Sequence, residues 1–156
     1  MDVTVMKLHR IFAGILIIAG LSACSAGQAE LPEPGQVFET IRQTVQLPEM
    51  VDVTADMLEA NTGIAAVEYV SAAYYIPLES AAPEEVILIR AVDDAAALAI
   101  QEKLESYLAY RVESAQVYLT EYMPVLQAGV VRRDGLTVSL IVSEQVSEIV
   151  SVYESW

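Results

Sequence analysis

The feature that most constrains the fold is a long stretch of helical periodicity in the second half of the chain. Asp93 and Asp94 precede it and suit the N-cap of a helix. A helix over 94–122 would be roughly 40 Å long at about 1.5 Å per residue, and Pro124 should bend or end it. Its apolar stripe has to be buried against another layer. Apolar side chains recur every three or four positions, at Ala97, Ile100, Leu104, Leu108, Val112, Ala115, Leu119 and Tyr122.

Two pairs of predicted strands flank this helix. Residues 66–76 are rich in Val and Tyr, and 85–92 form a nearly continuous apolar run, which is typical of a strand buried on both faces. Apolar runs at 128–133 and 136–143 surround Asp134-Gly135, a strong hairpin signal. The sequence therefore predicts two hairpins joined by the long helix.

Short helices complete the pattern. One is predicted over 36–46, a second over 55–60 with Thr54 as its N-cap, and a terminal one from Val146 to Tyr153. We therefore expect an α+β domain with an antiparallel four-stranded sheet made from the two hairpins. The long helix packs on one face of this sheet, and short N- and C-terminal helices are added to it. The order of the strands does not follow from the sequence.

The N-terminal segment resembles a secretory signal. Basic residues precede an apolar stretch of 13 residues from Ile11 to Ala23, whereas a membrane-spanning helix needs about 20. Leu21-Ser22-Ala23-Cys24 resembles a bacterial lipobox, in which the cysteine is acylated and the signal is cut before it. We expect a lipoprotein signal peptide at 1–23, a lipidated tether at 24–34 and one domain at 35–156. An ordinary signal peptide with an incidental cysteine is the alternative.

Charge and composition exclude several classes of protein. The chain has a formal net charge of −14, and 54% of its residues are hydrophobic. A chain this apolar can bury a core, which argues against a disordered acidic tail. Nucleic-acid binding is not expected, because phosphate contacts need clustered Lys and Arg. The segment after residue 23 carries 6 basic and 21 acidic residues, so a lipid, rather than charge, would have to hold it at a membrane.

Residue types limit the chemistry further. The only histidine is His9, in the predicted signal, and the only cysteine is Cys24. A Ser-His-Asp triad, a Cys-His dyad and a His- or Cys-ligated metal site are therefore excluded from the predicted domain. We expect no catalytic residues, no cofactor and no metal site. The closest carboxylate pairs could in principle do acid–base work or bind Ca²⁺, although capping and solvated turns are favoured for them. These pairs are Glu84 with Glu85, Asp93 with Asp94, and Asp52 with Asp56.

Tyrosines provide the candidate binding surface. Tyr107, Tyr110, Tyr118 and Tyr122 share the long predicted helix and, where exposed, would form a recognition surface. The favoured alternative is that they line the edge of the core with their hydroxyls at water. Arg132 and Arg133, neighbours on a strand, should point to opposite faces, where one of them could pair with a carboxylate or bind an anion.

The chain from Glu84 onward resembles a known family. The likeness is carried by Glu85 to Ala91, by Asp94 opening a long helix, and by Gly135 before the run from Leu136 to Ser143. Further matching features are Tyr122 with Pro124, Leu126 with Ala128 and Val130, Leu47 to Met50, Gly63-Ile64 and the lipobox. This is similar to the bacterial lipoproteins grouped as domain of unknown function 4358. The resemblance implies a small secreted lipoprotein, mostly found in Gram-positive bacteria, and implies no activity or cofactor. The low lysine content departs from the family pattern.

These observations together give a functional expectation. We expect a lipid-anchored protein of the cell envelope, outside the cytoplasmic membrane, held there through Cys24. It would act in non-catalytic binding or assembly with an envelope protein or a cell-wall component. The alternative is a small-molecule-binding sensor or transport-accessory lipoprotein. A hydrolase that uses only carboxylates is a third and weaker hypothesis.

Overall fold

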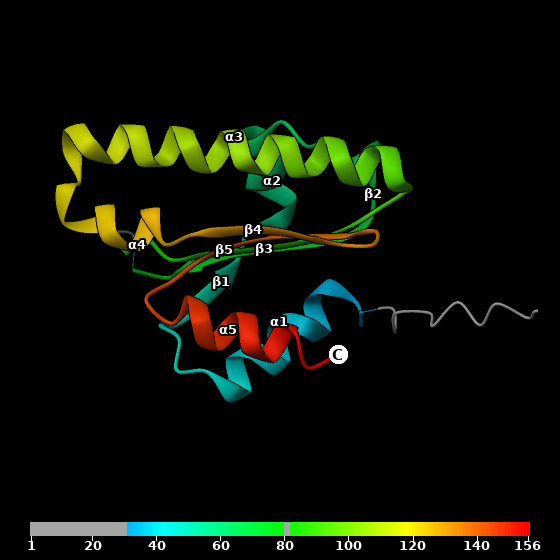
Figure 1. Ribbon diagram of the computed structural model, residues 1–156, viewed down its shortest axis with the longest axis horizontal. Helices are drawn as coiled ribbons and strands as arrows, with labels where there is room; N and C mark the ends of the chain where they lie inside the picture. Colours follow the sequence, from blue (N-terminus) through cyan, green and yellow to red (C-terminus); the bar gives the residue numbers. More distant parts are fainter. Residues whose placement is uncertain (1–30, 80–81) are drawn as a thin grey trace, which may run out of the picture.

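The computed structural model describes residues 31–79 and 82–156. In this part of the chain an open antiparallel sheet of five strands, in the order β1-β2-β3-β5-β4, has helices on both faces (Figure 1). The expected α+β class is therefore confirmed. The predicted signal peptide at 1–23 and the lipid site at Cys24 lie outside the described residues. No helix within the described ranges is long and apolar enough to cross a membrane.

The two predicted hairpins form the body of the sheet. The first joins β2 to β3 and the second joins β4 to β5, and β3 pairs with β5 to hold the two together. The central strands β3 and β5 are almost completely buried, as the continuous apolar run of β3 predicts. Gly135, with φ +59°, opens the tight turn between β4 and β5. The strands span Tyr69–Pro77 (β2), Glu85–Ala91 (β3), Val130–Asp134 (β4) and Thr137–Val142 (β5).

A fifth strand corrects the prediction of four. β1 (Met50–Asp52) pairs antiparallel with the outer side of β2, with Val51 opposite Ile76. The backbone N–H of Leu78 donates to the carbonyl of Glu49 at 2.8 Å and extends this pairing. Three residues are too few for an alternating pattern to be recognised, so this strand is defined by its partner and not by its own sequence.

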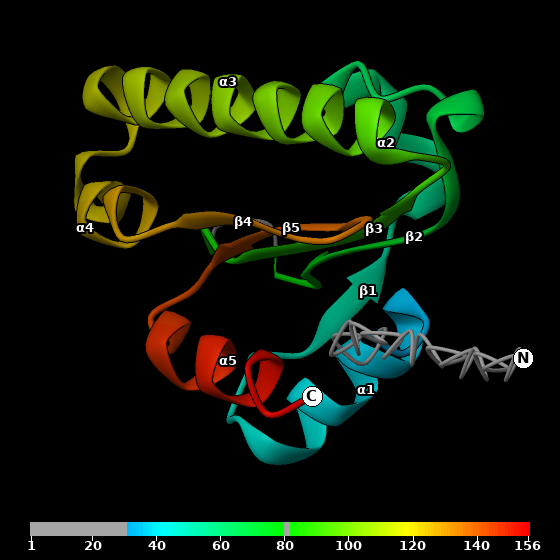
Figure 2. The same cartoon turned by 45° about the vertical axis from the view of Figure 1, so that its right-hand side comes forward.

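The long helix α3 (Asp94–Tyr118) lies across one face of the sheet (Figures 1 and 2). Asp93 caps it as predicted, because its carboxylate accepts a hydrogen bond from the N–H of Ala96 at 2.8 Å. The helix ends four residues earlier than predicted. Leu119 leaves the helical conformation and is 46% exposed, so it continues the apolar spacing without continuing the buried face.

The chain then turns back towards the sheet. A short 3₁₀ turn, η2 (Thr120–Tyr122), leads into α4 (Met123–Gln127), which delivers the chain to β4. Pro124 was predicted to bend or end the long helix. It lies instead in the first turn of α4. That position suits proline, because the N–H groups of a first helical turn have no partner within the helix.

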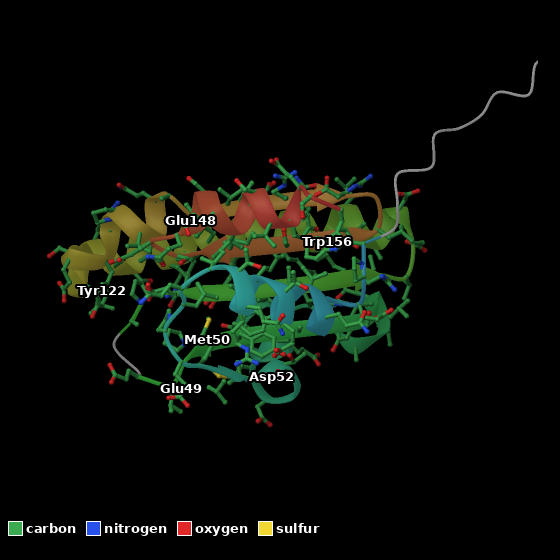
Figure 3. The ribbon with its side chains drawn as sticks, turned by 90° about the horizontal axis from the view of Figure 1, so that it is seen from below. Glu49, Met50, Asp52, Tyr122, Glu148 and Trp156 are labelled. Carbon is green, nitrogen blue, oxygen red and sulfur yellow. The ribbon has the colours of Figure 1, made fainter. Side chains whose placement is uncertain are left out.

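The remaining helices divide between the two faces of the sheet. α2 (Thr54–Thr62) lies on the same side as α3, while α1 (Pro34–Thr44) and α5 (Val146–Tyr153) cover the other side (Figure 2). Figure 3 shows this second side from below, with Glu148 on α5 and Met50 on the outer strand β1. Two apolar cores result, one on each face, and the ring of Phe38 in α1 stacks on Tyr75 of β2 at 3.5 Å.

Two predicted boundaries shift. Thr54 is the first residue of α2 and not its N-cap; its hydroxyl donates to the carboxylate of Asp52 at 2.5 Å and accepts from the N–H of Tyr74 at 2.7 Å. The first three residues of the strand predicted over 66–76 form the 3₁₀ turn η1 (Ala66–Glu68) instead. The partners of Thr54 lie in β1 and β2, which the periodicity of its own helix does not report.

The start of the described chain is packed against the domain. Leu31 is buried in the core beneath the sheet, and Pro34 already belongs to α1. The guanidinium of Arg90 in β3 donates to the carboxylate of Glu33 and, at 2.5 Å, to the carbonyl of Leu31. Of the predicted tether at 24–34, the last four residues therefore lie against the folded domain.

Candidate functional site

A buried carboxylate lies beneath α3. Glu85, the first residue of β3, is 1% exposed. Its Oε2 accepts hydrogen bonds from the hydroxyls of Tyr74 at 3.2 Å and Tyr107 at 3.1 Å, and from the guanidinium of Arg111. The amide of Asn61 donates to the Tyr74 hydroxyl at 3.1 Å. We call these five residues the Glu85 network; it joins α2, β2, β3 and α3.

The electrostatics of the Glu85 network follow from burial. Loss of water raises the pKa of Glu85, and the charge of Arg111 and the two tyrosine hydroxyls offset only part of this rise. Burial and the nearby carboxylate likewise raise the pKa of Tyr74 and of Tyr107, so both phenols stay protonated and act as donors. Among the described residues, Oε1 of Glu85 has no hydrogen-bond partner. The network thus holds the four elements together through Oε2 of Glu85 and leaves Oε1 as an unsatisfied acceptor.

The four tyrosines proposed as a binding surface do not share one environment. Tyr110 is 66% exposed. The hydroxyl of Tyr107 is directed inward, into the Glu85 network, and Tyr122 packs against the core between the sheet and α3. The side chain of Tyr118 lies outside the described part of the structure. Among the described tyrosines of this set, only Tyr110 offers an open ring.

A polar hollow of about 480 Å³ lies between α2 and α3. The amide of Asn61 and the ring of Tyr107 connect it to the Glu85 network beneath. Lys103 is already held at its edge by the carboxylate of Glu68 and the carbonyl of Gly63. The lining residues are Asn61, Thr62, Ala99, Glu102, Lys103, Ser106, Tyr107 and Tyr110. This hollow can accept a small polar molecule.

A second, more apolar depression of about 550 Å³ lies on α3 beside α4 and β4. We call it the α3 groove. Side chains of the upper core form its apolar lining, and acidic and amide side chains surround them. The lining residues are Glu105, Leu108, Ala109, Val112, Glu113, Gln116, Leu126, Gln127 and Val131. The arrangement can hold an apolar side of another molecule while polar groups contact its edges.

The charged residues singled out from the sequence lie in several places. Arg132 and Arg133 point to opposite faces, as predicted: Arg132 contacts Glu154 after α5 at 2.5 Å, and Arg133 approaches Asp94 at the start of α3 at 3.6 Å. Asp93 caps α3, as the capping interpretation predicts, whereas Asp52 is the last residue of β1 and accepts a hydrogen bond from the N–H of Thr54. Glu85 corrects that interpretation, because it is buried in the network and not placed in a solvated turn. In the described ranges, no group of three or more His, Cys, Asp or Glu side chains could hold a metal ion.

A comparison with known protein families identifies the family of this chain. The family model described as "Domain of unknown function (DUF4358)" matches residues 43–143. The chain belongs to this family. In this DUF4358 protein the matched range starts within α1, ends just after β5, and contains the Glu85 network and the α3 groove. It does not include the predicted signal and lipid site. No curated protein and no solved structure matches the chain.

The Glu85 network was not predicted, although the sequence contained a signal for it. A strand buried on both faces buries every residue, including its first. Glu85 shares its face with Ile87 and Ile89, which pack beneath α3. A carboxylate at that position of the run requires a donor from the helix above. The sequence spacing does not identify Arg111 as that donor.

Proposed function

We propose that this DUF4358 protein is a lipid-anchored protein of the cell envelope that binds a protein partner without catalysing a reaction. The observation that carries the proposal is the α3 groove. Leu108 and Val112, both half-buried, and the exposed Ala109 form its apolar surface above the buried Leu126, and Val117, the residue after the last lining residue of α3, is 68% exposed. Accessible apolar side chains that are surrounded by polar ones are typical of protein interaction sites.

The proposed location rests on the N-terminal sequence. The lipobox-like segment ending at Cys24 would place acyl chains just before the domain, on the outer side of the cytoplasmic membrane. Leu31 packs on the domain, so only a few residues would separate the lipid from the fold. The face covered by α1 and α5 lies on the same side of the sheet as Leu31, and the α3 groove lies on the other side. The groove would thus remain accessible to a partner in the envelope.

The non-catalytic character is supported by the residue types. The sequence after Cys24 contains no histidine and no cysteine, which removes the usual nucleophile–base pairs. Burial raises the pKa of Glu85, but Arg111 and two phenols occupy one of its oxygens. We infer that its role is to fix α3 on the sheet.

The polar hollow favours a second candidate function, a small-molecule-binding sensor or transport-accessory protein. Tyr110 offers an open ring, and Glu102 and Asn61 offer polar groups beside it. Such a set suits a small polyhydroxylated or amine-containing molecule. The smaller amount of exposed apolar surface makes this the second candidate.

Cross-linking in cells tests the first candidate. A photoreactive phenylalanine derivative replaces Ala109 in the α3 groove, and the control carries the same group at Ser147 on α5, which is also exposed. We expect one protein to be joined to the Ala109 variant and not to the Ser147 variant. Equal products from both positions, or none, would exclude the groove as the binding site.

The anchor is tested separately with Cys24→Ala in the full chain. In cell fractionation, the Cys24→Ala protein should be lost from the membrane pellet or remain as the uncut precursor. Ser25→Ala should change neither membrane association nor cleavage. If Cys24→Ala leaves mature protein in the membrane, the lipid-anchor hypothesis is wrong. This outcome would not depend on the groove, so the two parts of the proposal fail independently.

A further inference from the structure

We propose that the α3 groove receives a basic amphipathic helix of the partner protein. This inference rests on the proposed function and specifies the chemistry of the partner. The shape of the groove, the charge at its rim and the strand beside it each support the choice.

The shape of the groove matches a helix. Its lining residues on α3 run from Glu105 to Gln116, about three helical turns or roughly 16 Å. Leu108 and Val112 are four positions apart and lie on one side of α3, while Leu126 and Val131 line the groove from α4 and β4. A helix that presents apolar residues at positions i, i+3, i+4 and i+7 could pack along such a depression.

The charge at the rim favours a basic partner. Glu105 and Glu113 line the groove, and none of its nine lining residues is Lys or Arg. Within the described residues, neither carboxylate forms an ion pair; Glu105 accepts only a hydrogen bond from the neutral amide of Gln101. Arg111 lies between them in sequence, but its guanidinium is directed to Glu85 and to the carbonyl of Pro83. Two uncompensated carboxylates beside apolar surface are complementary to Lys or Arg next to an apolar face.

The neighbouring strand argues against an added β-strand as the occupant. β4 is the edge of the sheet, and pairing to such an edge is a common way to bind an extended segment. Its two arginines, Arg132 and Arg133, are paired with carboxylates, and its one carboxylate, Asp134, lies 3.6 Å from the guanidinium of Arg132. This strand therefore offers a basic segment no uncompensated carboxylate. The basic partner that the rim favours is therefore better accommodated above the sheet, along α3.

A peptide titration tests this assignment. The full chain is placed in nanodiscs of phosphatidylcholine, which has no net charge. The probe is a fluorescently labelled peptide of about 18 residues made of Leu, Lys and Gln, with Leu on one helical face and Lys beside it. We expect saturable binding above that of empty nanodiscs. The same peptide with every Lys replaced by Glu should not bind.

Matched variants locate the binding. Glu105→Lys with Glu113→Lys should weaken it by about tenfold or more, because two favourable contacts become repulsive. Glu144→Lys with Glu148→Lys makes the same change in net charge at exposed positions at and before α5 and should weaken it by less than about twofold. Ala109→Trp, which fills the groove without changing charge, should also weaken it by about tenfold.

Each other result overturns the inference. No binding above empty nanodiscs, equal loss in the two double variants, or unchanged binding with Ala109→Trp would exclude a basic helix in the groove. A specific cross-link at Ala109 in cells, together with any of these results, would leave the proposed function standing and reject only the partner chemistry. Absence of that cross-link would reject the proposed function itself.

Discussion

The guanidinium of Arg111, in the middle of α3, donates to the buried carboxylate of Glu85 at the first residue of β3. The two residues are 26 positions apart in sequence. Their contact joins the long helix to a central strand, and Tyr107, which also donates to Glu85, lines the polar hollow. The two partners differ in burial: the side chain of Glu85 is 2% exposed and that of Arg111 is 27% exposed.

This inequality predicts unequal effects of removing either partner. Arg111→Met leaves a carboxylate in a buried site with only two hydroxyl donors, which should lower the free energy of unfolding by about 2–3 kcal/mol. Glu85→Gln should cost less, about 1 kcal/mol, because Arg111 can turn to water and the amide can still accept from the tyrosines. Urea unfolding followed by circular dichroism gives both values. Arg42→Met, which breaks the exposed pair with Glu39, is the control and should leave the urea midpoint unchanged.

The raised pKa of Glu85 predicts a pH dependence of stability. Between the pKa of the unfolded chain and the higher pKa of the fold, the folded state binds more protons, so stability falls as pH rises through this window. The contribution is fully present below the unfolded pKa and is lost above the folded one. The unfolding free energy of the wild type minus that of Glu85→Gln, measured from pH 4 upward, should therefore decrease as pH rises. A difference that increases would show that Arg111 outweighs burial.

Glu68 provides the opposite sign in the same experiment. Its partial burial alone would raise its pKa, but hydrogen bonds from Lys103 and from the N–H of Ala65 lower it overall. Its stabilising contribution is therefore present above the unfolded pKa and is lost as pH falls through the folded pKa. The unfolding free energy of the wild type minus that of Glu68→Gln should increase as pH rises from about 3 to 5. A flat difference would mean that Lys103 does not hold Glu68 in solution.

Gly129 is predicted to be intolerant of a methyl group. A Cβ there would lie 3.0 Å from the carbonyl oxygen of Leu126, 3.0 Å from a methyl of Val142 and 3.1 Å from a methyl of Leu108. Gly129→Ala should therefore cost about 1–2 kcal/mol, since backbone and packed side chains would have to shift. The matched change Gly35→Ala, in the first turn of α1 with nothing within 4 Å, should be neutral or stabilising. Thermal unfolding of the two variants compares them, and equal melting temperatures would refute the predicted clash.

The cap of α3 gives a further test. Asp93→Ala removes the acceptor for the N–H of Ala96 and should cost about 1 kcal/mol. Asp94→Ala removes an equal charge one residue later, where the carboxylate is 82% exposed and 3.6 Å from Arg133. It should have the smaller effect, because an exposed ion pair contributes little. If chemical denaturation finds the two variants equal, the N-terminal charge of the helix matters and the hydrogen bond does not.

The local sequence determined most of the elements. The apolar spacing of α3, the continuous run of β3, the Asp134-Gly135 pair and the pattern of α5 are local signals in the sequence. All four elements form where these signals predict them, except that α3 ends four residues earlier. Asp93 likewise acts on its own helix. From these elements follow the α+β class and the two hairpins.

Only the tertiary structure decided the rest, because the remaining features depend on residues that are distant in sequence. β1 exists through its pairing with β2, and α3 ends at Tyr118 so that the chain can return to the edge beside β5. Glu85 could be placed inward from the strand pattern, but its partners Tyr74, Tyr107 and Arg111 come from β2 and α3. The α3 groove is lined by residues of three separate elements, α3, α4 and β4. Spacing along a chain reports which face a residue occupies, whereas the packing of separate elements determines what that residue meets there.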